Sequence, residues 1–221
     1  MDDNKIRMAY KKSISIYDEI LRGKTWWSKL YLKTFWGGYS DDDIAKALLS
    51  RIPVDFSGSI LDIPVGTGIF TANTYKMLKN ASITGVDYSE DMLVRCRENM
   101  KDLKVDIKLQ QGDVGNLTFD DNTFDMVLSM NGFHAFPNKE SAFENCKRVL
   151  KPGGTFLACF YIKNEIQISD FLVNNVLSPK GWFTPPFDTK ESLMRRLEVD
   201  YDILWFSIDG AIISVECRKK D

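Results

Sequence analysis

Residues 59–70 read Ser-Ile-Leu-Asp-Ile-Pro-Val-Gly-Thr-Gly-Ile-Phe, and the rest of the chain can be laid out around them. An apolar run that ends in Asp62, a turn of small residues and a helical pattern predict a strand, a loop and a helix. Gly66 and Gly68 have no Cβ, so they can adopt positive φ and let a ligand lie against the backbone. The following helix directs its free N–H groups to the same place. The stretch therefore predicts either an ordinary strand–helix turn or a ligand-binding loop.

Bulk composition indicates a globular protein without an electrostatic preference for nucleic acid. The chain has 221 residues, of which 44% are hydrophobic and 27% are charged, and its formal net charge is −2. This length suits one domain with a sizeable core. Neither nucleic acid nor an anionic membrane surface is an expected partner, because a net negative chain gains nothing from their phosphates.

The chain shows no targeting, membrane or metal signal. Residues 1–5 lack an apolar signal core, and no apolar run is long enough to span a bilayer, so we expect a cytoplasmic protein. The four cysteines are far apart and form no CxxC pair, and the chain has a single histidine. A metal site built from cysteine and histidine is therefore not expected.

Strand-like and helix-like segments alternate at short spacing through the middle of the chain, which predicts a parallel sheet with helices on both faces. Two strand-like runs joined by Asp209-Gly210 predict a hairpin at the end. The first predicted strand ends at Asp62. The other predicted strands cover residues 82–87, 106–110, 124–129, 155–162, 199–208 and 211–218. The predicted helices cover residues 4–21, 26–35, 40–51, 70–79, 89–100, 138–150, 165–177 and 189–197, and residues 151–154 form a tight turn.

These elements predict an α/β fold of the doubly wound, Rossmann-like kind. Its seven-stranded sheet is mostly parallel, with a C-terminal antiparallel hairpin and helices on both faces. We expect one domain over residues 1–221. Its parts are an N-terminal helical cap (1–52), a cofactor-binding core (59–162), a helical insertion or pocket wall (163–198) and the terminal hairpin (199–218).

Two aromatic regions permit both a structural and a functional interpretation. The segment before residue 38 and the loop 181–187 are rich in aromatic rings, which either pack onto the core or line a pocket for a flat or cationic guest. In the first region, Tyr10, Tyr17 and Trp27 are the candidates to face a ligand. Ser40 is interpreted as the N-cap of a helix, and the acidic residues 41–43 as its first turn, where negative charge stabilises the helix dipole.

Acids end or follow three successive predicted strands: Asp62, Asp87 and Asp113. In an open parallel sheet, ligands bind beyond the carboxyl ends of the strands. Asp87 lies about twenty residues past the glycine turn, the spacing at which a carboxylate accepts both ribose hydroxyls in dinucleotide folds. Asp113 could accept from the exocyclic amine of adenine, although alone it is most often a turn residue. Together they predict an adenosine site.

Two cofactor classes have such an adenosine. A nicotinamide dinucleotide also needs room for a pyrophosphate, and its fingerprint places a third glycine where this chain has Thr71. Asp62 would also face the phosphates. Both features favour S-adenosyl-L-methionine, whose tail carries a cationic amino group. A nicotinamide-dependent oxidoreductase and a non-catalytic module that binds an adenosine ligand stay as alternatives.

At this point the chain resembles the class I S-adenosylmethionine-dependent methyltransferases, and especially their small-molecule branch of ubiquinone/menaquinone-biosynthesis-like, type 11 enzymes. The match covers residues 59–162, with Pro64-Val65 where that family usually has Gly-Cys. The motifs are Leu-Asp-Ile-Pro-Val-Gly-Thr-Gly (61–68), Gly-Val-Asp-Tyr-Ser (85–89) with Asp-Met-Leu (91–93), Gly-Asp-Val (112–114), Phe-Asp-Met-Val-Leu-Ser (124–129) and Val-Leu-Lys-Pro-Gly-Gly (149–154).

The resemblance implies an enzyme that transfers a methyl group to a small molecule, and it implies a role for each matching residue. The methionine part would lie against Asp62, Gly66, Thr67 and Gly68, and Asp87 would bind the ribose. The adenine would lie beside Tyr88 and Met92 and would be recognised by Asp113 and the Val114 backbone. The sulfonium would lie near Ser129 and Met130.

Methyl transfer from a sulfonium is an in-line displacement, so the enzyme mainly aligns the nucleophile, the methyl group and the sulfur. An oxygen or nitrogen nucleophile can also need a base. His134, the only histidine, follows the fourth predicted strand and is a candidate base or substrate orienter, or else a residue that holds the loop. Tyr17 is a candidate to close over the cofactor. The acceptor is expected to be small and partly apolar or aromatic.

Overall fold

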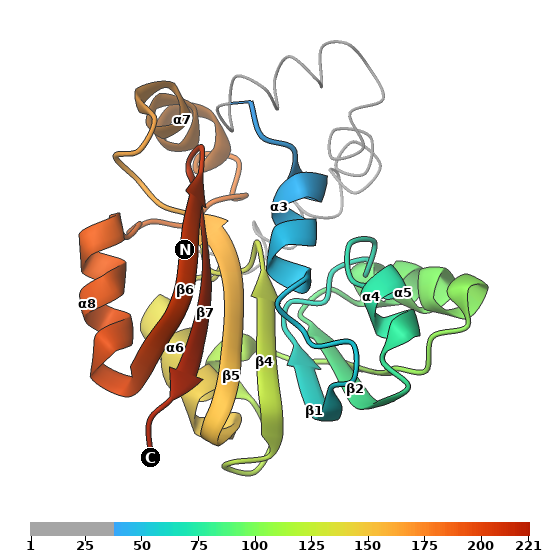
Figure 1. Cartoon of the computed structure of the whole chain (residues 1–221). Helices are drawn as coiled ribbons and strands as arrows, with labels where there is room; N and C mark the ends of the chain where they lie inside the picture. The colour runs from blue at the N-terminus through green and yellow to red at the C-terminus, as the bar shows by residue number, and fades with distance from the viewer. Residues whose placement is uncertain (1–37) are drawn as a thin grey trace.

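The computed structural model of the chain describes residues 38–221, and these residues build one mixed sheet with helices on both sides (Figure 1). The strand order is β3-β2-β1-β4-β5-β7-β6. The strands are β1 (Ser57–Asp62), β2 (Asn80–Asp87), β3 (Lys108–Gln111), β4 (Phe124–Met130), β5 (Leu150–Tyr161), β6 (Tyr201–Asp209) and β7 (Ile212–Lys219).

The pairing pattern confirms the predicted fold class. Strands β1 to β5 pair in parallel, whereas β7 is antiparallel to both β5 and β6. The hairpin thus inserts its second strand next to β5 and leaves β6 at the edge. The helices are α3 (Asp41–Leu49), α4 (Ala72–Met77), α5 (Glu90–Leu103), the 3-10 helix η1 (Val114–Asn116), α6 (Lys139–Val149), α7 (Gln167–Leu172), the π-helix η2 (Val173–Leu177) and α8 (Lys190–Asp200).

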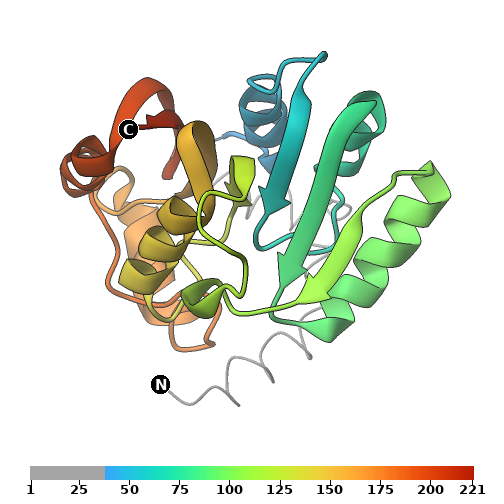
Figure 2. The same cartoon turned by 90° about the horizontal axis from the view of Figure 1, so that it is seen from below.

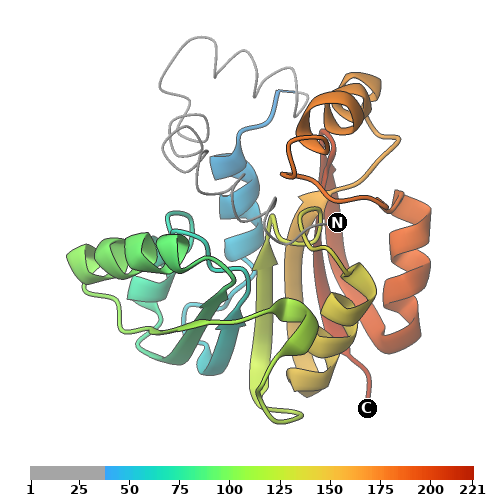
Figure 3. The ribbon, with the colours of Figure 1, turned by 180° about the vertical axis from the view of Figure 1, so that it is seen from behind.

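Two apolar layers hold the helices on the sheet. Leu48 of α3, Tyr75 of α4 and Cys96 of α5 belong to the cluster on one face. Phe143 of α6 and Leu197 of α8 belong to the cluster on the opposite face. Figures 2 and 3 show these two groups of helices on either side of the strands. The doubly wound arrangement follows, because each strand of the centre buries side chains on both faces.

Several predicted boundaries are wrong in detail. Helix α4 is shorter than expected, and the predicted helix 165–177 divides into α7 and η2. Helix α8 extends to Asp200, so β6 begins two residues later than predicted. The predicted turn 151–154 lies inside β5: Leu150 pairs with Phe124 and Thr155 with Met126, so the intervening residues form an irregularity in the strand, where Gly153 has φ +69°.

Two further expectations concern the N-terminal helices and membrane-spanning segments. The predicted helices 4–21 and 26–35, and with them Tyr10, Tyr17 and Trp27, lie outside the described residues. Within residues 38–221, no helix combines the length and apolarity needed to cross a membrane.

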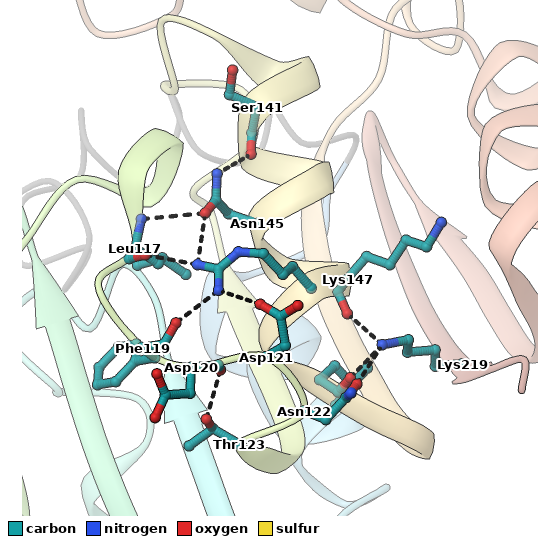
Figure 4. A network of polar contacts seen from close by, with 12 residues as sticks. Leu117, Phe119, Asp120, Asp121, Asn122, Thr123, Ser141, Asn145, Lys147 and Lys219 are labelled. Carbon is teal, nitrogen blue, oxygen red and sulfur yellow. Dashed lines mark hydrogen bonds and ion pairs between the residues drawn. The ribbon is translucent and has the colours of Figure 1, made fainter.

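A polar network anchors the connection between β3 and β4 to α6 (Figure 4). The Asn145 amide donates to the Gly115 carbonyl oxygen at 3.0 Å, and the Arg148 guanidinium donates to the carbonyl oxygens of Leu117 and Phe119 at 2.7 Å each. Lys219 of β7 adds a hydrogen bond to the Leu150 carbonyl oxygen at 2.5 Å. The network fixes the segment that follows Asp113, so the end of β3 has a defined position relative to α6.

Candidate functional site

The carboxyl ends of the parallel strands meet at one edge of the sheet, seen where the arrowheads of β4 and β5 end in Figure 1. Asp62 ends β1 and Asp87 ends β2. Both side chains are almost fully buried, at 1% and 7% exposed. The structure therefore brings these two predicted acids together, and each one's environment decides what it can bind.

Asp62 is held by a residue that the sequence did not single out. The Tyr75 hydroxyl of α4 donates to Asp62 Oδ2 at 2.7 Å. Burial raises the pKa of Asp62 to about 7, and the Tyr75 hydrogen bond opposes that rise. A carboxylate with this pKa becomes fully charged only above neutral pH, and a nearby cationic group would favour its charged form.

Asp87 connects the glycine turn to the following helix. Its Oδ2 accepts from the Gly66 backbone N–H at 2.9 Å, and its Oδ1 accepts from the Ser89 N–H at 2.9 Å. Burial raises the pKa of Asp87, while these backbone donors lower it. The carboxylate thus lies directly beside the loop, as ribose binding at the switch between strands requires.

The two glycines of the turn have positive φ, +55° at Gly66 and +67° at Gly68, but different surroundings. A Cβ at Gly66 would meet no atom within 4 Å, so this backbone faces open space. A Cβ at Gly68 would lie 2.4 Å from Met100 Cε, so this glycine allows α5 to pack closely. Thr67 lies between them, nearly buried, and its carbonyl oxygen accepts from the Asn99 amide at 2.9 Å.

An open hollow of about 290 Å³ lies beyond β2 and β3 and is lined by Tyr88, Gln111, Gly112 and Asp113. Two of these, Tyr88 and Asp113, are predicted adenine neighbours. Gln111 was missed: its amide donates to the Tyr88 carbonyl oxygen at 2.9 Å, and only the fold places the two side by side.

The other predicted adenine neighbours are placed differently. Asp113 Oδ1 accepts from the Gly115 N–H at 2.8 Å and so caps η1, the turn role considered for it. Met92 and Val114 are 4% and 6% exposed and do not line the hollow.

At the end of β4, the predicted sulfonium neighbours Ser129 and Met130 have different environments. Ser129 is fully buried, and no group within residues 38–221 forms a hydrogen bond with its Oγ. A Cβ at Gly132 would lie 2.4 Å from Pro64 Cδ and 2.9 Å from Ser129 Oγ, so the loops after β1 and β4 touch there. Met130 packs against the cluster on the α3 face.

His134 lies inside the loop that follows β4. Its Nδ1 accepts the Tyr161 backbone N–H at 3.3 Å, and its ring stacks on Phe183 with the centroids 4.1 Å apart. Burial, with a contribution from Lys139, lowers the pKa of His134 to about 3. These contacts favour the loop-holding role, since an imidazole that accepts through Nδ1 carries its proton on Nε2.

The aromatic loop 181–187 packs on the same loop. The Thr184 N–H donates to the His134 carbonyl oxygen at 2.8 Å, and Lys139 Nζ donates to the carbonyl oxygens of Phe136 and Thr184. Phe183 and Phe187 are buried beside Tyr161. The loop therefore belongs to the core and also borders the end of β5.

Comparison with known proteins now identifies the domain. Residues 60–154 match the family model described as "Methyltransferase domain". Residues 60–154 thus form a class I S-adenosylmethionine-dependent methyltransferase domain. The cofactor of this family is S-adenosyl-L-methionine.

Relatives of this methyltransferase domain include quinone-pathway enzymes. Demethylmenaquinone methyltransferase of Staphylococcus epidermidis is 37% identical over 110 residues, 49% of this chain and 45% of that protein. A ubiquinone/menaquinone biosynthesis C-methyltransferase of Idiomarina loihiensis is 32% identical over 146 residues, 61% of this chain and 58% of that protein. The chain thus matches about half the length of these relatives.

Solved structures share the fold. A putative methyltransferase of Bacillus halodurans superposes with a TM-score of 0.69 at 18% identity, covering 81% of this chain and 100% of that one. A Thermotoga maritima protein described as a possible histamine N-methyltransferase superposes with a TM-score of 0.68 at 19% identity, covering 97% of this chain and 100% of the other. At these identities the likeness concerns the fold alone.

Proposed function

We infer that the chain transfers a methyl group from S-adenosyl-L-methionine to a small-molecule acceptor by in-line displacement. The observation that supports this most is the continuous donor edge formed by Asp62, the open backbone at Gly66, Asp87 and the hollow at Asp113. Those features follow one another along the ends of β1, β2 and β3. They would hold, in order, an amino-acid tail, a ribose and an adenine.

Each donor-side residue has a specific task in this proposal. Asp62 would bind the cationic amino group, with the Tyr75 hydroxyl stabilising its charged form. Asp87 would accept from the ribose hydroxyls while its contacts to Gly66 and Ser89 hold the two loops together. Tyr88 and Asp113 would contact the adenine.

Bound S-adenosyl-L-methionine supplies an electrophilic methyl group on a sulfonium. The protein's contribution is then alignment and exclusion of water, because the leaving group is already good. Ser129 and Met130 at the end of β4 would lie near the reacting atoms. His134 would orient the loop beside them, and a base role for it stays a prediction for kinetics to test.

The acceptor side favours a small, partly apolar molecule. Phe183, Phe187 and Tyr161 gather beside the ends of β4 and β5. The relatives' names point to quinone-type acceptors in those proteins. A small aromatic acceptor is therefore the class we propose.

Two measurements test the function. Calorimetry should detect one molecule of S-adenosylhomocysteine per chain and no heat with a nicotinamide dinucleotide. Incubation with methyl-labelled donor and a small-molecule extract should transfer the label to a product of low molecular mass. Binding of the dinucleotide instead would support the oxidoreductase alternative. Donor binding without any labelled product would favour a non-catalytic binding module.

A further inference from the structure

Asp41, the first residue of α3, is buried in a way that its two neighbours are not. Its side chain is 6% exposed, whereas Asp42 and Asp43 are exposed. Ser40 caps the helix by accepting from the Asp43 N–H at 3.1 Å, so the cap does not use Asp41. Among the residues that the structure describes, Asp41 Oδ2 finds no hydrogen-bond partner. Neutralising the helix dipole needs an acid near this end, but it does not need a buried one.

Figure 1 shows the N-terminal end of α3 on the side of the carboxyl ends of the parallel strands, and Asp41 is the first residue of α3. Just past the other end of the helix, Arg51 pairs with Glu216, which lies opposite Leu157 in β5. Asp41 interacts electrostatically with Cys159, two residues further along β5. Cys159 lies opposite Met130, the last residue of β4. Asp41 therefore lies near the ends of β4 and β5, on the opposite side of β4 from the ends of β1, β2 and β3.

A second unsatisfied polar atom lies on the same face. Ser214 of β7 is directly opposite Cys159, so their side chains share one face of the sheet. Ser214 is fully buried, and its Oγ has no hydrogen-bond partner in the described part of the chain. Helix α3 covers this face, because Ile44 and Leu48 share a core cluster with Cys159 and Ile212. Two orphan polar groups thus border the same buried thiol.

Leaving both groups unpaired is costly, since a buried polar atom without a partner loses its hydration. Burial, with the neighbouring charge of Asp42, raises the pKa of Asp41 to about 7. Cys159 of β5, whose thiol pKa is raised to about 12, interacts with Asp41, and Ser214 lies opposite Cys159 on the same face. Within residues 38–221 neither is a cation that would pair with the carboxylate, so a ligand group is a partner that would satisfy it.

We propose that Asp41 and Ser214 form the polar end of the acceptor pocket and bind the hydroxyl that Asp41 deprotonates during methyl transfer. This rests on the proposed methyltransferase function. In the step, the acceptor oxygen forms a bond to the methyl carbon while the carbon–sulfur bond breaks and its electron pair stays on sulfur. The hydroxyl proton moves to Asp41 Oδ2. The products are the methyl ether, neutral S-adenosylhomocysteine and the protonated carboxyl group.

The surroundings select the chemical class of that hydroxyl. Cys159, Ile212 and the aromatic side chains near Tyr161 make the region apolar, which disfavours a cationic amine. A carboxylate can take the proton of a phenol or enol more readily than that of an aliphatic alcohol, because a phenol has a pKa of about 10. The acceptor class is therefore a small neutral phenol or enol.

The test compares two matched ligands on the intact chain saturated with S-adenosylhomocysteine. 2-Naphthol carries the phenolic hydroxyl, and 2-methoxynaphthalene lacks it. We expect 2-naphthol to bind roughly tenfold more tightly, the effect of one hydrogen bond to a charged group. With S-adenosyl-L-methionine in place of S-adenosylhomocysteine, the chain should convert 2-naphthol to 2-methoxynaphthalene. Asp41→Asn and Ser214→Ala should each reduce the binding preference, and Asp41→Asn should also abolish this conversion.

Asp42→Asn is the matched control, because it removes an equal charge from the exposed side of the same helical turn. It should keep both the binding preference and the conversion of 2-naphthol. Equal affinity for the two ligands, no binding of either, or a preference that survives in Asp41→Asn would overturn the inference while donor binding stays intact. If S-adenosylhomocysteine itself does not bind the wild-type chain, the proposed function fails instead. Circular dichroism and donor affinity of each variant report whether it has folded.

Discussion

The donor and acceptor halves of the carboxyl edge differ in how completely their polar groups are paired. On the donor half, Asp62 is bonded to Tyr75 and Asp87 to two backbone N–H groups. On the acceptor half, Asp41, Ser129 and Ser214 supply three of the six buried side-chain polar atoms that lack partners within residues 38–221. Within the described residues, the polar groups of the proposed donor half are therefore paired, whereas those of the proposed acceptor half are not.

The largest expected effect tests the donor half. Asp87→Ala removes the carboxylate proposed to accept from both ribose hydroxyls. It should weaken S-adenosylhomocysteine binding about 100-fold, since each hydrogen bond to a charged group contributes roughly 1.5 kcal/mol. Asp106→Ala, an exposed acid before the next strand, is the control and should bind normally. Calorimetry measures both, and unimpaired binding by Asp87→Ala would contradict the ribose assignment.

Alanine substitutions at two glycines distinguish the effect of ligand contact from the effect of backbone strain. Gly66 and Gly153 both have positive φ and open space where a Cβ would lie. Alanine at either position should lower stability by about 1 kcal/mol, the strain of a left-handed residue. Only Gly66→Ala should also weaken donor binding, by roughly tenfold, because its methyl group would enter the cofactor space. Equal donor affinity in the two variants would remove Gly66 from the site.

His134 tests the acceptor half. His134→Ala should lower turnover at least tenfold and leave donor affinity nearly unchanged, because the side chain holds the Tyr161 backbone and stacks on Phe183. Burial keeps its pKa far below the ordinary value, so the wild-type rate should show no step near pH 6.5 that disappears in the variant. Steady-state kinetics with an identified acceptor measure both. Unchanged turnover would exclude His134 from the mechanism.

The smallest expected effect is a shift in pH dependence. The Asp62 pKa is raised to about 7, so the anion that would bind the cationic donor tail forms as pH rises through 7, and donor affinity should rise with it. Tyr75→Phe removes the hydrogen bond that stabilises this anion and should move the midpoint to higher pH. The affinity loss at pH 7 should be only a few-fold. Titrations from pH 6 to 9 that coincide for both proteins would argue against an Asp62 contact.

The sequence could indicate candidate residues for the donor half because the motifs that contain them are local. The glycines around Thr67 and the acids that end β1 and β2 lie within short, ordered motifs, and strand ends in a parallel sheet necessarily meet. The class of fold followed from the alternation of strands and helices. Its boundaries were less accurate where the backbone is irregular, as in β5, where Gly153 lies in a bulge that the sequence marks only as a turn.

Contacts between distant segments could not be predicted from the sequence in either half. Tyr75 reaches Asp62 on the donor half, and Ser214 lies opposite Cys159 on the acceptor half, only once the chain has folded. Asp41 was interpreted as one of three equivalent acids at a helix start, because periodicity could not show which of them is buried. His134 was found as the only histidine, but its backbone partner, Tyr161, could not be predicted from spacing.

The most direct test of the central claim is a calorimetric titration of the intact chain with S-adenosylhomocysteine, repeated with Asp87→Ala. The claim predicts saturable binding of one molecule per wild-type chain and a large loss in the variant. Absence of any heat with a folded wild-type protein, or equal binding by both proteins, would contradict a cofactor site at the ends of β1 and β2.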